Sequence, residues 1–185
     1  MKKVILLLAF VVLGATANAQ DFLGIKPTGS LLGTTNQFKA RGFRVVTDSE
    51  NVKIMEGKYA NMNVEVVIGA SPITKTVWKI SVYFPKQTNW YTIKKEYYDY
   101  LDILTSKYGE PKSTYNFFTE PYYEGDGYEM QAVGLEKCTY AAYWFGETNI
   151  GLSISEYHQI NISYENDANT QLKKSETLTL QSRGL

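Results

Sequence analysis

The sequence has a single cysteine, Cys138, and a single histidine, His158, among 185 residues. One cysteine cannot form an internal disulfide, so the fold depends on its apolar core. One histidine excludes multi-histidine metal sites and the serine–histidine–aspartate triad in their usual forms. The chain also lacks a glycine-rich phosphate loop and a G-x-S-x-G motif. We therefore expect no metal, no cofactor and no catalytic residues of a conventional type, and we read Cys138 as a packed thiol and His158 as a solvated turn residue.

Long apolar runs are absent except near the N-terminus. Lys2 and Lys3 precede the uninterrupted apolar run at residues 4–13, and Ala17-Asn18-Ala19 follows it. A transmembrane helix needs about 20 apolar residues, so this run is too short to span a bilayer. The order of basic, apolar and small residues is that of a secretory signal peptide. We expect residues 1–19 to be cleaved near Ala19, leaving a periplasmic or secreted protein that begins at Gln20.

Excess charge of one sign is absent too. Loss of the two signal lysines leaves 17 basic and 19 acidic residues, a formal charge of −2. This balance gives no electrostatic reason to expect nucleic acid or an anionic membrane as a partner. Tyrosine, in contrast, is abundant: nine of the fifteen tyrosines lie between Tyr91 and Tyr128. Tyrosine is common both at binding interfaces and on half-buried sheet faces.

Hydrophobic periodicity predicts eight strands and two helices. The expected strands are residues 43–48, 52–59, 62–69, 76–84, 112–118, 137–145, 149–155 and 159–165. The clearest strand directs Trp78, Ile80, Val82 and Phe84 to one side. The expected helices are residues 30–41 and 89–108. The second has an apolar stripe of Trp90, Ile93, Tyr97, Leu101, Leu104 and Tyr108, against which the clearest strand should be buried.

These elements predict an α+β fold with antiparallel sheet and a tandem duplication of a helix-then-strands unit. The halves are residues 20–87 and 88–167, followed by a polar tail, 168–185, that we expect to be frayed or weakly helical. In each half a glycine ends the helix, at Gly42 and Gly109. Val66-Val67-Ile68-Gly69 is echoed by Tyr143-Trp144-Phe145-Gly146, and Lys79-Ile80-Ser81 by Asn161-Ile162-Ser163.

The segment Phe22-Leu23-Gly24-Ile25, followed by a Gly-Ser helix start, and the stretch from Trp90 to Lys107-Tyr108-Gly109-Glu110-Pro111 resemble a group of small exported proteins of Gram-negative bacteria. That group is largely uncharacterised. The repeated plan is similar to the tandem architecture of β-lactamase inhibitor protein. The resemblance covers most of the mature chain at the level of plan. It implies a fold and a binding role, and it carries no functional residues.

A Gly-rich loop at residues 119–129 is the best functional lead. It contains Tyr122, Tyr123 and Tyr128 around Asp126, and we expect it to be ordered, with at least two of these tyrosines partly exposed. If exposed, these four residues form a candidate binding site. The alternative is that the tyrosines fill the edge of the core. The acidic cluster also suggests oxygen ligands for calcium, although turn chemistry explains Gly125-Asp126-Gly127 without metal.

We expect a non-enzymatic exported interaction module that binds an envelope or extracellular protein. One alternative is a glycan-binding module whose exposed tyrosine and tryptophan rings stack on sugars. The other is a hydrolase with carboxylates drawn from Glu120, Glu124, Asp126 and Glu129.

Overall fold

The structure is a computed structural model that describes residues 20–183, so the expected signal peptide lies outside the described residues. The elements are α1 (Leu31–Lys39), β1 (Arg44–Asp48), β2 (Val52–Tyr59), β3 (Met62–Ala70), β4 (Val77–Tyr83), α2 (Trp90–Tyr108), β5 (Ser113–Phe118), α3 (Glu129–Gly134), β6 (Cys138–Trp144), β7 (Thr148–Ile154), β8 (Ile160–Asn166) and α4 (Asp167–Ser182). All eight expected strands and both expected helices are present, with bounds shifted by two residues at most.

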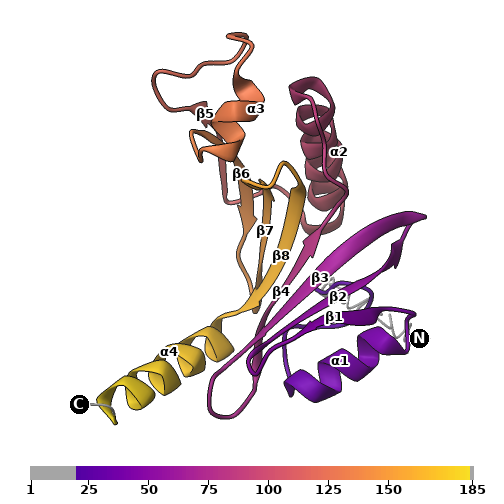
Figure 1. Ribbon diagram of the computed structural model, residues 1–185, viewed down its shortest axis with the longest axis vertical. Coiled ribbons are helices and arrows are strands. Elements are labelled where there is room, and N and C mark those ends of the chain that lie inside the picture. Colours follow the sequence, from indigo (N-terminus) through magenta and orange to yellow (C-terminus); the bar gives the residue numbers. More distant parts are fainter. Residues whose placement is uncertain (1–19, 184–185) are drawn as a thin grey trace, which may run out of the picture.

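The strands form one antiparallel sheet in the order β1-β2-β3-β4-β8-β7-β6-β5. The predicted α+β class with antiparallel sheet is therefore confirmed. β4 and β8 pair at the centre of the sheet, and β1 and β5 form its two edges. Figure 1 shows how strongly the sheet twists, so that β1 to β3 and β5 to β7 diverge on either side of this central pair.

The two predicted helices begin at polar caps. The side chain of Ser30 accepts a hydrogen bond from the backbone N–H of Gly33, and Asn89 accepts one from Thr92. Such caps satisfy backbone donors that the first helical turn leaves unpaired. α2 ends at Gly109, whose φ of 81° is a left-handed conformation that glycine adopts without strain.

α1 and α2 cover one face of the sheet, α1 over β3 and α2 over β6, β7 and β8. We call this the covered face and the opposite one the open face. Alternate residues of each central strand point toward the covered face and are buried, for example Val66 and Ile68 on β3. On α2, Ile93, Tyr97 and Leu104 are buried above β6, β7 and β8. The core therefore lies between the two helices and one face of the sheet.

Trp78 is the exception to the predicted core. A β-bulge between β3 and β4 pairs Gly69 with Lys79 but Ala70 with Val77, leaving Trp78 as the extra residue. Val77 is buried instead, together with Ile80, Val82 and Phe84 as predicted. The half-buried Trp78 ring lies over Gly69 on the open face. The prediction placed Trp78 on the wrong face because strict alternation cannot register a bulge.

The expectation of two helices is also wrong, because the described chain contains α3 and α4 as well. α4 occupies the tail that was expected to be frayed or weakly helical, and Figure 1 shows it projecting away from the sheet. The amide of Asn169 donates to the carbonyl oxygens of Val77 (2.8 Å) and Pro27 (3.3 Å). Glu176 accepts hydrogen bonds from the loop before β4. Because polar side chains dock α4, the tail lacks the apolar periodicity that would have predicted it.

Candidate functional site

The loop at residues 119–128 joins β5 to α3 and is held by hydrogen bonds within itself. The carboxylate of Asp126 accepts from the backbone N–H groups of Tyr123 (3.1 Å) and Tyr128 (2.7 Å). Glu129 accepts from the N–H of Gly125 at 2.8 Å. The predicted ordered loop is thus present, and its Asp126 acts as a turn-stabilising acceptor.

Glu124 anchors the loop to the body of the protein. Its carboxylate accepts from the ammonium of Lys94 and the indole N–H of Trp90 on α2, and from the hydroxyl of Tyr140 on β6. The hydrogen bond from Lys94 is the main reason that the pKa of Glu124 lies below its usual range. Glu124, Asp126 and Glu129 therefore all accept hydrogen bonds from the protein itself. They are three of the four carboxylates considered for a hydrolase.

Two of the three loop tyrosines are exposed, as the sequence predicts. Tyr123 and Tyr128 are 65 % and 61 % exposed, whereas Tyr122 is half-buried and packs against the core. The structure therefore places Tyr123 and Tyr128 in solvent around Asp126 and assigns Tyr122 mainly to packing. Among residues 20–183, no group of three histidine, cysteine, aspartate or glutamate side chains could hold a metal ion.

A second aromatic group lies on the open face, where β5 and β6 pair. It consists of Tyr115, Phe117, Tyr143 and Phe145, all exposed, and we call it the aromatic strip. The rings of Tyr115 and Tyr143 are 6.2 Å apart, and those of Tyr143 and Phe145 stack at 6.5 Å. Sequence analysis missed this strip because both sides of the β6 segment are apolar, so its periodicity does not reveal which side is buried.

β5 presents a free edge beside this strip, since no strand within residues 20–183 pairs with its outer side. The N–H of Thr119 donates to the carbonyl oxygen of Lys137, and the β5–β6 register continues from that pair. In an antiparallel ladder the hydrogen-bonded positions alternate, so the backbone N–H groups of Thr114 and Asn116 point away from β6. The side chains of both residues are exposed as well, so α2 leaves the middle of this strand uncovered and contacts only its end, where Trp90 packs against Phe118 at 5.4 Å.

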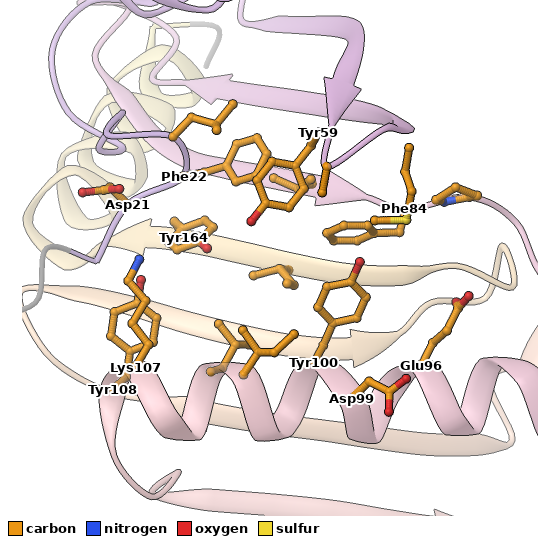
Figure 2. Close-up of a pocket in the computed structure, with 18 of the residues that line it drawn as sticks. Asp21, Phe22, Tyr59, Phe84, Glu96, Asp99, Tyr100, Lys107, Tyr108 and Tyr164 are labelled. Atoms are coloured by element: carbon orange, nitrogen blue, oxygen red, sulfur yellow. The ribbon is translucent and has the colours of Figure 1, made fainter.

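The covered face holds a cavity of about 680 Å³ between α2, the segment 21–24 and the central strands. Figure 2 shows Phe22, Tyr59, Phe84, Tyr100 and Tyr164 arranged around it, with Glu96 and Asp99 at one end and Asp21 and Lys107 at the other. Sequence reasoning could not find this cavity, because its walls come from segments as far apart in the sequence as Asp21 and Tyr164.

Cys138 and His158 are both packed. Burial raises the pKa of the Cys138 thiol to about 12, so the group stays protonated at neutral pH. The expectation of a packed thiol is confirmed. His158 was expected to be solvated, but its Nε2 lies 2.9 Å from the carbonyl oxygen of Met130. A carbonyl oxygen only accepts, so Nε2 carries a proton and ties the turn before β8 to α3.

No family model, no curated protein and no solved structure matches this chain. The resemblance to small exported proteins with an inhibitor-like tandem plan therefore stays a prediction. Within residues 20–183, no helix is both long and apolar enough to cross a membrane. The candidate sites thus stand on their own geometry: the free β5 edge with its aromatic strip and adjoining loop, and the cavity of the covered face.

Proposed function

We propose that this protein is a non-enzymatic binding module, acting in the periplasm or at the cell exterior, that docks an extended segment of a partner protein along the edge of β5. The observation that supports this proposal most strongly is the free edge of β5. Exposed backbone donors and acceptors on an edge strand can add a strand from another chain. The aromatic strip on the open face would contact the side chains of the partner.

The contrast between the two edges of the sheet supports this proposal. β1 has charged residues, Arg44 and Asp48, at its ends and a bulge between Val45 and Thr47. Charges and bulges are the devices by which proteins protect an edge from pairing. β5, with the sequence STYNFF, has no charged residue, no proline and an unbroken register. One edge is therefore protected and the other is not.

Aromatic side chains flank the unprotected edge at two points. The aromatic strip lies on the open face of β5 and β6, and the loop that carries Tyr123 and Tyr128 directly follows β5. Aromatic residues supply large contact areas at low cost in conformational entropy, and they are enriched among the residues that dominate binding energies. Contiguous exposed aromatics on a soluble protein typically mark a partner surface.

The test is site-specific photo-crosslinking in a fraction of the source cell envelope. A photoreactive phenylalanine analogue replaces Phe117 beside the edge, or Leu178 on α4 as the exposed control position. We expect one discrete protein adduct from position 117 and none from position 178. Identical adducts from both positions, or none from either, would contradict the proposal.

A matched pair of substitutions then tests whether the edge itself binds. Asn116→Pro removes an N–H that faces away from β6, so the sheet should tolerate it, whereas Asn116→Ala keeps that donor. The adduct at position 117 should disappear with proline and persist with alanine, while the Tm of both variants stays near the wild-type value. Binding of the wild type to a glycan array without any protein adduct would favour the glycan alternative instead.

Export is part of the proposal and has its own measurement. Mass spectrometry of the protein recovered from the envelope fraction should find Gln20, as such or cyclised, at the N-terminus. A retained Met1 would contradict the expected signal peptide.

The order of elements also supports the proposed tandem duplication. A helix followed by four strands occurs twice, with α3 inserted after the first strand of the second unit, and the last strands of the two units pair at the centre of the sheet. The echo of Lys79-Ile80-Ser81 in Asn161-Ile162-Ser163 falls on these equivalent strands, where Ser81 pairs with Ser163. The glycine echo does not support it, because Gly69 lies on the third strand of its unit and Gly146 follows the second.

A further inference from the structure

The cavity of the covered face arises from the spacing of the two helices. α1 lies over β3 and α2 over β6 to β8, so the space above β4 is left to side chains and to the segment after Gln20. Phe22 from that segment packs against Tyr59 and Tyr164, and Phe84 packs against Tyr100 at 4.4 Å. These contacts build firm aromatic walls without filling the volume between them.

The volume and the walls suit a small organic molecule. Pockets for such ligands measure roughly 300–1,000 Å³ and combine mainly apolar walls with a few polar groups that orient the ligand. This cavity, at about 680 Å³, falls in that range. Val82 and Ile162 of the central strands and Leu104 of α2 add aliphatic surface to its aromatic walls.

Three phenol groups line the cavity without a hydrogen-bond partner among residues 20–183. They belong to Tyr59 on β2, Tyr100 on α2 and Tyr164 on β8. Tyr164 is only 5 % exposed, and all three tyrosines line the cavity. Figure 2 shows the hydroxyls of Tyr59 and Tyr100 pointing into it.

These hydroxyls are available as donors at neutral pH. Burial raises the pKa of both Tyr100 and Tyr164 above the ordinary value of a phenol, so both keep their protons. A polar group that loses water without gaining a partner costs free energy, and a ligand with an acceptor atom would remove that cost. Charged groups lie only at the two ends of the cavity, and the carboxylates of the acidic end are engaged with the protein itself. Asp99 pairs with Lys95 at 2.6 Å, and Glu96 accepts a hydrogen bond from the amide of Gln87 at 2.8 Å, so the walls between the ends are left to an uncharged ligand.

We infer that the cavity is a binding site for an uncharged, mostly apolar small molecule that carries a hydrogen-bond acceptor, such as a ketone, ester or amide oxygen, for the unpartnered phenols. This site is distinct from the β5 edge and independent of the proposed partner protein. The apolar body lies between the aromatic walls, and the acceptor accepts from Tyr100 or Tyr164.

The probe for this site is prodan, a neutral naphthalene ketone whose fluorescence increases and shifts to shorter wavelength in apolar surroundings. Titration of the purified protein should give saturable binding at one site per chain.

Ile103→Trp tests the location, because Ile103 lines the cavity on α2 but is 58 % exposed and so tolerates substitution. Leu32→Trp on α1, at a residue that is 70 % exposed and away from the cavity, is the matched control. Binding should fall at least about tenfold in the first variant and remain unchanged in the second.

The phenols are tested by Tyr100→Phe and Tyr164→Phe. Because neither hydroxyl has a described protein partner, each variant should keep its Tm. Loss of one neutral hydrogen bond should weaken prodan binding about two- to tenfold, with a further emission shift to shorter wavelength in at least one variant. Absence of saturable binding would overturn the site, and equal binding by Ile103→Trp and wild type would place the probe elsewhere. A lower Tm with unchanged affinity would show the hydroxyls to be structural.

Discussion

Gly57 on β2 lies beneath the ring of Phe43, and the two residues show how closely this core is packed. A Cβ atom added at Gly57 would lie within 3 Å of three ring carbons of Phe43. The Phe43 ring is itself held by an edge-on contact with Phe38 of α1 at 5.3 Å. The ring therefore cannot retreat without moving the helix.

Gly57→Ala should consequently lower the free energy of unfolding by about 1–3 kcal/mol, the usual cost of overpacking a core. Urea denaturation measures the loss, and Lys58→Ala on the same strand, where the side chain is exposed, is the matched control. Equal stability of the two variants would mean that Phe43 does not cover this glycine.

Cys138 provides a second prediction at the scale of a residue. Its thiol is buried, and its pKa of about 12 keeps it protonated at neutral pH. Because the thiolate is the reactive species, the native protein should not react with a thiol-specific reagent such as a disulfide dye. Stoichiometric reaction should appear only in denaturant, and rapid labelling of the native state would contradict the described packing.

At the scale of elements, one carboxylate of α4 holds the helix to the loop before β4. Glu176 accepts hydrogen bonds from the N–H groups of Ile73 (2.7 Å) and Thr74 (3.1 Å) and from the Thr74 hydroxyl (2.6 Å). Burial alone would raise the pKa of Glu176, but these hydrogen bonds outweigh it and lower the pKa to about 2. The folded state thus favours the ionised carboxylate more than the unfolded chain does.

This difference sets a direction for the pH dependence. Glu176 stabilises the fold above its ordinary pKa, and the stabilisation is lost as the pH falls from about 5 toward 2. Glu176→Gln should have a lower Tm than wild type at pH 7, and the gap between the two should close toward pH 2. Thermal melts across this range measure it. A gap that stays constant from pH 7 to pH 2 would contradict the role of the carboxylate.

The elements that could be predicted from sequence are those whose apolar residues repeat at a regular local spacing. The helix over 90–108 has a continuous stripe and a glycine stop, and each strand has at least one alternating face. α3 has only six residues, and α4 docks through Asn169 and Glu176, so neither has a periodic apolar face to detect. Trp78 was misplaced because a bulge, which depends on pairing with Gly69, interrupts the alternation.

At the scale of the whole molecule, the candidate sites were less predictable than the elements. The loop tyrosines could be named because glycines and aromatics cluster within one short segment. The aromatic strip and the free edge could not, since they depend on β5 being last in the strand order. The cavity depends on the same unknown, because β2, β3, β4 and β8 must follow one another in the sheet before Tyr59, Phe84 and Tyr164 can share its wall.

The free β5 edge is the central claim, and amide hydrogen exchange resolved by residue tests it most directly. In the isolated protein, the amides of Ser113, Tyr115 and Phe117 face β6 and should exchange slowly. Those of Thr114 and Asn116 face away and should exchange at least about a hundredfold faster, close to the rate of an open chain. This alternation along one strand is the predicted result. Slow exchange at all five amides would mean that the edge is already covered and would contradict the account.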